Sequence, residues 1–526
     1  MVRGVSRRCR LGVVLLCWLG LGCAPAVETP PESGRLVVIG VDSLSWELID
    51  PLIEQSELPN LTALRDRGWG ATMQTVEPLI SPPNWTSIAT GRRPDAHGIT
   101  SFFADRRHVR VPTTWERLAA AGRRVGVYDV LVTWPPRELP DGVVIPGWLR
   151  RDASVWPPDL AERWGGEPYT YQVLDMGSLD DTVAQMEEEL ERKPIDFLHL
   201  LDTFDLDVGF VNFYAVDVVN HRFRHTFTPD VFDPPIPVES RFDGVLLDTL
   251  RQVDRAIGTI VDGLDGRDHV LVVSDHGATA SSPVPRLWGF ATPRLLAEAG
   301  LDVDGSVRTI NGFIEAVFQI ADGPADARDA TIARFVEGVD TIRTADGEPL
   351  FAVDVVREPE TVVAVSPPDA PRIDRMAPNL PAHAFVFVSV AHPEVDRLWP
   401  DGIVTIGDRS ERVGDWIQAH DFTGDHHPLA LFLAAGPAVS PNLPRGNVSV
   451  VDVASWVLHL AGQPIPADLE GRSPAPWLDP EHLKRFPVRV IPADQAAVLP
   501  PEPDAPMIAT DDAELEERLR ALGYVE

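Results

Sequence analysis

Seven residues spread along the chain combine the ligand types of a metal centre with one hydroxyl nucleophile. They are Asp, His and Ser residues: Asp42, Ser81, Asp217, His221, Asp275, His276 and His426. Carboxylate oxygens and imidazole nitrogens are suitable ligands for divalent ions. Two such ions favour hydrolysis, because one activates a nucleophile while the other stabilises the leaving oxygen. The set therefore predicts a two-metal hydrolytic site.

Each member of this set also has a simpler interpretation. Asp42 could cap a helix that begins near Ser45, because Asp is a favoured helix N-cap. Asp217 and His221 point the same way only if a helical turn joins them. Ser81 could simply start a helix, although a hydroxyl there would also meet backbone N–H groups and the positive end of the dipole. His427 competes with its neighbour His426 as a ligand, so only the set as a whole carries weight.

The elements that must position these residues alternate between strands and helices. Apolar runs predict buried strands at 36–41, 125–132, 208–215, 269–274, 384–390 and 429–435. Helical patterns lie at 57–67, 113–121, 180–192, 240–264, 326–338 and 449–462. This alternation predicts an α/β fold with a largely parallel sheet between helices. Asp42, Asp217 and Asp275 follow predicted strands, where ligands of such folds gather.

The chain divides into a leader, a catalytic body and a tail. Residues 1–23 carry basic residues and then an apolar run, which predicts a signal peptide. The end of this signal peptide fits either a lipoprotein signal at Cys23 or simple cleavage after Ala26. Residues 24–34 are expected to form a tether. Residues 35–470 form the body, with cap-like insertions near 133–180 and 300–380. Residues 471–526 form a Pro-rich tail that ends in a short helix.

Composition excludes several classes of function. The formal charge is −33, from 79 acidic and 46 basic residues, and Lys193 and Lys484 are the only lysines. Such a surface argues against binding of nucleic acid or of an anionic lipid surface. All three cysteines, Cys9, Cys17 and Cys23, lie in the leader, so the body has no disulfide and no thiolate ligand.

Several sequence runs resemble one enzyme superfamily in order and in flanking residues. They are VVIGVDSLSWELIDP, SPPNWTSIATGRRPDAHGI, AVDVVNH, VVSDHGA and TGDHHPLALFLAAGP. They resemble the alkaline phosphatase superfamily, and the nearest branch is the type I phosphodiesterase and nucleotide pyrophosphatase group, as an exported bacterial member. The run from Thr90 to Ile99 is specific to this branch. A sulfatase is disfavoured, because the run from Ser81 to Trp85 lacks the Arg of the sulfatase motif.

The resemblance assigns roles to the seven residues. It implies two zinc ions, or manganese in their place, one held by Asp217, His221 and His426 and the other by Asp42, Asp275 and His276. Ser81 would attack phosphorus, contact the second ion and form a phosphoseryl intermediate. Asn84 and Trp85 are further candidates for substrate contact, although both could instead pack at the start of the helix. Phe102 and Phe103 occupy the region where nucleotide pyrophosphatases carry a phosphate-binding Asn, which argues against a nucleotide substrate.

The expected function is hydrolysis of phosphate esters, foremost of diesters. Two divalent ions would bring four positive charges against three aspartates and one alkoxide, which suits a monoanionic substrate. The alternatives are a phosphomonoesterase, a phosphoryl-group transferase acting on envelope components, and a non-catalytic lipid-anchored binding protein. We expect a small-molecule or glycan- or lipid-linked phosphoester as substrate, and a periplasmic or cell-envelope location with membrane contact only through a lipid anchor. The sequence leaves the oligomeric state open.

Overall fold

The computed structural model describes most of the catalytic body. The described residues are 34–102, 104–171, 179–232, 235–236, 238–281, 287–301, 307–313, 315–320, 324–356, 384–392, 395–420 and 423–500. The expected leader, the expected tether up to residue 33, Phe103 and the expected C-terminal helix lie outside them. Among the described residues, no helix is both long and apolar enough to cross a lipid bilayer.

An eight-stranded sheet forms the centre of the larger lobe. Its order is β19 (Gly446–Ser449), β2 (Gly68–Gln74), β18 (Leu429–Ala435), β6 (His269–Val273), β1 (Leu36–Val41), β5 (Val208–Phe213), β3 (Val125–Val130) and β4 (Val143–Pro146). Only β18 runs antiparallel to its neighbours. The central strands β1, β3 and β5 are buried along their whole length, because helices cover both faces. The predicted α/β fold with a largely parallel sheet is confirmed.

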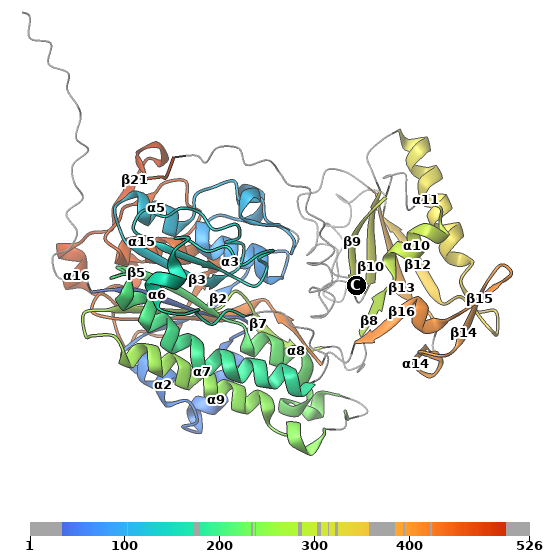
Figure 1. Cartoon of the computed structure of the whole chain (residues 1–526), viewed down its shortest axis with the longest axis horizontal. Helices are drawn as coiled ribbons and strands as arrows, with labels where there is room; N and C mark the ends of the chain where they lie inside the picture. The colour runs from blue at the N-terminus through green and yellow to red at the C-terminus, as the bar shows by residue number, and fades with distance from the viewer. Residues whose placement is uncertain are drawn as a thin grey trace, which may run out of the picture.

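Helices pack on both faces of this sheet (Figure 1). On one face lie α2 (Pro59–Asp66), α7 (Leu179–Thr203), α8 (Ala215–Phe227) and α9 (Val245–Asp262), in contact with one another. On the other face lie α3 (Ser81–Thr90), α5 (Thr114–Ala120) and α15 (Val453–Leu460). The α9 helix shows why such segments fold here: its apolar residues from Val245 to Ile260 line one stripe that is buried. Shorter helices are α1 (Trp46–Glu54), α4 (Pro94–His97) and α6 (Leu160–Trp164).

A second lobe has its own sheet and its own hydrophobic core. Its six strands are antiparallel, in the order β12 (Phe351–Val356), β13 (Phe385–Val390), β10 (Glu315–Ile320), β9 (Val307–Phe313), β8 (Leu287–Phe290) and β16 (Ile417–His420). Helices α10 (Thr292–Glu298), α11 (Ala325–Asp340) and α14 (Val395–Leu398) belong to it, with a small sheet of β11 (Arg343–Thr344), β14 (Ile403–Ile406) and β15 (Arg409–Arg412). The strand expected at 384–390 therefore lies in this sheet and not in the main one.

The second lobe is inserted into a hairpin of the larger lobe. That hairpin pairs β7 (Gly277–Ala280) with β17 (Gly424–His427), and Ser281 N donates to Thr423 O at its open end, 2.9 Å away. The expected insertion at 133–180 contains β4, which extends the main sheet, and α6. After α15, β20 (Ile465–Pro466) pairs with β21 (Val490–Ile491), and α16 (Pro480–Arg485) lies between them in sequence. Trp477 stacks on Trp69 at 4.6 Å, so this part of the tail packs against the body.

Candidate active site

Three adjacent parallel strands bring the three aspartates together. β1 lies between β6 and β5, so the carboxyl ends of all three strands meet at one edge of the sheet. Asp42 directly follows β1, and its backbone N–H donates to Phe213 O at the end of β5, 2.9 Å away. Asp217 lies in the first turn of α8, and Asp275 follows β6. Strand order therefore gathers three residues that span 233 positions of the sequence, from Asp42 to Asp275.

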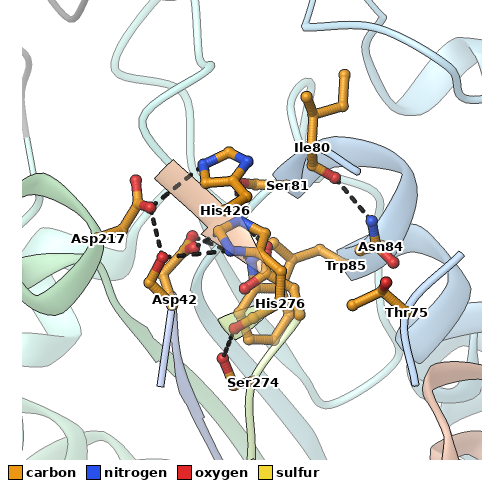
Figure 2. A network of polar contacts seen from close by, with 12 residues as sticks. Asp42, Thr75, Ile80, Ser81, Asn84, Trp85, Asp217, Ser274, His276 and His426 are labelled. Carbon is orange, nitrogen blue, oxygen red and sulfur yellow. Dashed lines mark hydrogen bonds and ion pairs between the residues drawn. The ribbon is translucent and has the colours of Figure 1, made fainter. Parts of the chain in front are cut away.

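One ligand group forms around the imidazole of His276. Its Nε2 atom lies 3.2 Å from Ser81 Oγ, 3.3 Å from Asp42 Oδ1 and 3.2 Å from Asp275 Oδ2. All four side chains are at most 3% exposed. Figure 2 shows Asp42, Asp217, His276 and His426 gathered beside Ser81. This arrangement brings the expected nucleophile and the expected ligands of one ion to a common point.

A second ligand group forms around Asp217. Its Oδ1 atom lies 3.3 Å from His221 Nε2 and 3.4 Å from His426 Nε2, and these two nitrogens are 3.1 Å apart. The ring of His426 stacks on that of His276 with a centroid distance of 3.8 Å, so the two groups are adjacent. Ligand atoms of Asp217, His276 and His426 lie within 4.8 Å of one another, as do those of Asp42, Asp275 and His276. His276 thus faces both groups.

The backbone fixes which nitrogen of each histidine faces the site. Three carbonyl oxygens lie beside the three Nδ1 atoms: Gly424 O by His221 at 2.9 Å, Leu79 O by His426 at 2.9 Å, and Gly277 O by His276 at 3.2 Å. A carbonyl oxygen can only accept a hydrogen bond, so each Nδ1 donates its N–H. Each Nε2 is then left with a lone pair that points into the site. This is the arrangement that orients histidines as metal ligands.

The electrostatics of the site favour a bound cation. Burial, together with Asp275 and Asp217, raises the pKa of Asp42 well above its usual range. Burial and Asp217 raise the pKa of Asp275 in the same way. Among the described residues, no arginine or lysine pairs with these two carboxylates, and Asp42 Oδ1 and both Asp275 oxygens accept no hydrogen bond. Buried carboxylates without donors are costly unless they bind metal. The residues present therefore fit a pair of divalent ions.

The histidines respond to the same environment. Burial opposes the charged form of His221, but Asp217 outweighs burial and raises the pKa of His221. Burial also acts on Asp217, yet His221 and His426 hold the pKa of Asp217 well below its usual range. Burial and the neighbouring His426 lower the pKa of His276 well below its usual range. His276 is thus kept neutral, as a metal ligand must be.

Ser81 is the first residue of α3, as expected, but the helix end differs from a usual anion site. Pro82 and Pro83 follow directly, and proline has no backbone N–H. Of the first four residues of α3, only Ser81 and Asn84 therefore carry a backbone donor. The helix terminus offers a substrate less positive charge than its dipole suggests, and this places more of the anion binding on the two ligand groups.

Two residues that the sequence singled out have other contacts. The substrate contact expected of Asn84 stays a prediction, and in the structure its Oδ1 accepts from Val76 N at 2.8 Å. Its Nδ2 donates to the carbonyls of Val76, Pro78 and Ile80 at 3.0–3.2 Å. Asn84 thus holds the loop before Ser81, and it turns away from the ligands in Figure 2. His427 lies on the opposite face of β17 from His426, because side chains alternate along a strand, and its Nδ1 accepts from Leu429 N.

The arginines and aromatic residues near the motifs also have partners elsewhere. Arg92 bonds Asp468 at 3.2 Å and Glu470 at 2.9 Å, and Arg93 pairs with Glu470. Both arginines therefore form ion pairs with the C-terminal part of the body. Phe102 is buried and packs against Trp148, with the ring centroids 6.1 Å apart.

Sequence reasoning missed Ser43 and offered Trp85 only as a candidate for substrate contact, yet both residues contact the ligands directly. Trp85 Nε1 donates to Asp42 Oδ2 over 3.2 Å, and Ser43 Oγ donates to Asp217 Oδ1 over 2.7 Å. Ser43 Oγ also lies 3.2 Å from His276 Nδ1. Ser43 adjoins Asp42 and Trp85 follows Ser81 by one helical turn, so proximity to the motifs was the only signal in the sequence.

The chain is similar to several known proteins. An uncharacterized pyrophosphatase/phosphodiesterase of Schizosaccharomyces pombe is 24% identical over 313 residues, which are 54% of this chain and 55% of the relative. The chain thus spans about half the length of that curated relative. Among solved structures, murine ectonucleotide pyrophosphatase/phosphodiesterase 5, in an inactive variant bound to AMP, is 16% identical with a TM-score of 0.46. The human protein of that name is 14% identical with a TM-score of 0.45. Both alignments cover 85% of this chain and 100% of the other.

A family match covers more than half of the chain. The model of the type I phosphodiesterase/nucleotide pyrophosphatase family matches residues 36–354. This range contains six of the seven site residues and ends before His426. The family that the motifs resembled is therefore confirmed, and the chain belongs to the type I phosphodiesterase/nucleotide pyrophosphatase family.

Proposed function

We propose that this protein hydrolyses phosphate diesters at a two-metal site, with Ser81 as the nucleophile. The observation that supports this most strongly is the convergence of Ser81 Oγ with Asp42 Oδ1 and Asp275 Oδ2 on His276 Nε2, all within 3.3 Å of that nitrogen. The group of Asp217, His221 and His426 lies beside it. A nucleophile between two such groups suits an in-line displacement at phosphorus.

Each side chain has a defined part in this proposal. Asp42, Asp275 and His276 hold one ion, and Asp217, His221 and His426 hold the other; zinc suits these ligands best and manganese is the alternative. When bound, the ions lower the pKa of the serine hydroxyl and neutralise charge on the phosphate oxygens. Ser81 Oγ forms a bond to phosphorus while the ester bond to the leaving oxygen breaks. Water then hydrolyses the phosphoseryl intermediate.

Charge favours a diester over a monoester. Two divalent ions are balanced by three aspartates and the Ser81 alkoxide, so the loaded site is neutral. A dianionic monoester would need further cations; Arg92 and Arg93 pair with Asp468 and Glu470, and Arg222, next to His221, is a cation that could serve it. Lys193, one of the two lysines, is buried among acidic partners of its own. A monoanionic diester or phosphonate monoester matches the site better.

A substrate panel tests the reaction and its class. Protein without residues 1–33 is loaded with zinc and assayed on bis-nitrophenyl phosphate, nitrophenyl phosphate, a nitrophenyl phosphonate ester and nitrophenyl sulfate. We expect the highest kcat/KM on the diester or the phosphonate. Ser81→Ala should lose roughly 10³-fold or more, which is about 4 kcal/mol of barrier height. The control is Ser45→Ala, whose buried hydroxyl has no hydrogen-bond partner within the described structure.

Two results would overturn the proposal. One is a turnover on every substrate that equals that of Ser81→Ala, which would leave a non-catalytic binding protein as the better interpretation. The other is metal analysis that finds fewer than about two ions per chain. A clear preference for nitrophenyl phosphate would replace the diesterase with a phosphomonoesterase. Transfer of the phosphoryl group to an added alcohol, in place of water, would indicate a transferase.

We also infer that the protein is exported and held at the cell envelope by a lipid on Cys23. The basic and apolar leader and the Pro-rich tether support this inference. In a bacterial host, the full chain should partition into detergent after phase separation, and Cys23→Ser should move it to the aqueous phase. Aqueous partitioning of both proteins would favour simple signal cleavage.

A further inference from the structure

Ser43 contacts both ligand groups of the site at once. Its Oγ donates to Asp217 Oδ1 over 2.7 Å and lies 3.2 Å from His276 Nδ1. The side chain is fully buried, so water does not compete for these contacts. Asp217 belongs to the group with His221 and His426, whereas His276 Nε2 faces Ser81, Asp42 and Asp275.

The single proton of the hydroxyl fixes the direction of both bonds. A carboxylate can only accept, so the Ser43 proton goes to Asp217. The Ser43 oxygen must then accept from His276, whose Nδ1 carries the N–H that also faces Gly277 O at 3.2 Å. Ser43 thereby helps to select the His276 tautomer whose Nε2 lone pair faces Ser81 and the first ligand group. One side chain orients a ligand in each group.

The backbone at Ser43 indicates that the hydroxyl has a use. Its φ is 64°, in the left-handed region that glycine adopts easily and other residues rarely do. Glycine would fit the turn after Asp42 with less strain. The backbone conformation therefore gives no reason for a serine at this position. Within the described residues, the polar contacts of the Ser43 hydroxyl are those with Asp217 and His276.

We propose that Ser43 is a positioning residue that links the two metal groups, so that its loss weakens binding of both ions. The proposal rests on the proposed two-metal site. Its physical basis is that outer hydrogen bonds orient metal ligands, and their removal costs roughly 10- to 100-fold in metal affinity. Trp85 offers a contrast, because its Nε1 bonds only Asp42 and should affect the Asp42, Asp275 and His276 group alone.

The test compares Ser43→Gly, Ser45→Ala and Trp85→Phe with the unchanged protein. Zinc affinity and stoichiometry are measured by competition with a chromophoric chelator, and the melting temperature is measured on the metal-free protein. For Ser43→Gly we expect both zinc affinities to fall roughly 10- to 100-fold. Its metal-free melting temperature should change little, because relief of the left-handed backbone opposes the loss of the hydrogen bonds of the hydroxyl. Ser45→Ala should bind zinc normally, and Trp85→Phe should weaken one ion only.

The outcomes separate this inference from the function on which it rests. Unchanged zinc affinity in Ser43→Gly, with two ions bound by the unchanged protein, overturns the role of Ser43 and leaves the two-metal site standing. A metal-free melting temperature that falls much further in Ser43→Gly than in Trp85→Phe, which also loses one hydrogen bond to a carboxylate, overturns it too, because Ser43 would then serve mainly the fold. Fewer than two zinc ions in the unchanged protein overturns both proposals.

Discussion

A buried lysine behind the site gives the sharpest prediction about stability. Lys193 is fully buried; its Nζ lies 2.7 Å from Asp129 Oδ2, pairs with Glu189 and donates to Asn212 O over 2.8 Å. Glu189 in turn accepts from Tyr214 N at 3.1 Å and Ala215 N at 2.9 Å, the backbone donors where α8 begins. The lysine therefore supports the carboxylate that caps the helix of Asp217 and His221.

Replacement of Lys193 by methionine keeps the volume and removes the charge. Two buried carboxylates, Asp129 and Glu189, would then lose their common cation. Removal of one partner from a buried ion pair costs about 3–5 kcal/mol. Total stabilities are about 5–15 kcal/mol, so we expect a folded but clearly weakened protein. Lys484→Met is the matched control, because this other lysine is mostly exposed beside Glu481 and should change stability by less than about 1 kcal/mol.

The loss of unfolding free energy in Lys193→Met should depend on pH, and the direction of this dependence follows from the pKa of Glu189. Burial already raises the pKa of Glu189, although Lys193 opposes this, and removal of the lysine would raise it further. A carboxyl whose folded pKa exceeds its unfolded pKa binds more protons when folded, so its favourable contribution is lost as pH rises. The destabilisation should therefore be larger at pH 8 than at pH 5.5.

The assay is urea unfolding of metal-free protein, followed by tryptophan fluorescence at both pH values. Adding Glu189→Gln to Lys193→Met should recover part of the stability, because the amide oxygen can still accept from the start of α8. Zinc affinity of the Asp217 group should fall along with stability in Lys193→Met. The reasoning is refuted if the free energies of unfolding of Lys193→Met and Lys484→Met agree within about 1 kcal/mol. It is also refuted if Lys193→Met loses the same free energy of unfolding at both pH values.

Three further predictions follow from the same structure. Burial lowers the pKa of His97 to about 4, while its Nδ1 accepts from Ile99 N and its Nε2 contacts Ser87. Because the folded protein keeps this histidine neutral, the free energy of unfolding should fall as the pH drops below the unfolded pKa of histidine, by about 2 kcal/mol between pH 7 and pH 5. In urea unfolding at several pH values, His97→Gln should show a smaller change over this range. Asn84→Ala should lower the free energy of unfolding by about 2–4 kcal/mol in the same assay, because the loop before Ser81 loses its hydrogen bonds. The same change should lower kcat, and an unchanged kcat would show that Ser81 does not depend on Asn84 for its position. Chelation should lower the melting temperature and zinc should restore it, since zinc neutralises buried carboxylates; an unchanged melting temperature in calorimetry would contradict the metal assignment.

The strand ends could be predicted from the sequence, whereas their order in the sheet could not. Asp42 and Asp275 each follow an apolar run, and the pattern places such residues at the carboxyl edge of a sheet. Only the pairing of β1 with β5 and β6 brings them within reach of one imidazole. The resemblance to a family supplied the grouping of ligands that spacing alone left open.

Elements whose character depends on distant contacts were not predictable. β2 was not predicted, because its sequence GWGATMQ holds two glycines and no β-branched apolar residue, although Trp69, Ala71 and Met73 alternate as buried residues once β18 and β19 pair with it. The segment 384–390 has the apolar pattern of a central strand, yet it pairs with β10 and β12 in the second lobe. Lys193 follows the acidic run EEELER, which predicts a solvent-exposed face of a helix. In the structure Lys193 is buried, because Asp129 of β3 and Asn212 of β5 contact its Nζ.

The position of the second lobe explains how ligands so far apart in sequence can form one site. His276 and His426 are about 150 residues apart, and the lobe occupies most of that interval. The chain leaves and re-enters through the hairpin of β7 and β17, whose ladder pairs His426 with Ala278. Thr423 N donates to His221 O over 2.7 Å, and Gly424 O accepts from His221 Nδ1 over 2.9 Å.

These bonds fasten the point of re-entry to α8 before the chain reaches His426. The cost of closing such a long loop grows only with the logarithm of its length, so the ladder can offset it. We therefore expect a change in the size of the second lobe to leave His426 in place relative to His221. The hydrogen bonds that the described structure shows orienting the ligands lie within the larger lobe, which is why an insertion at this hairpin is compatible with the site.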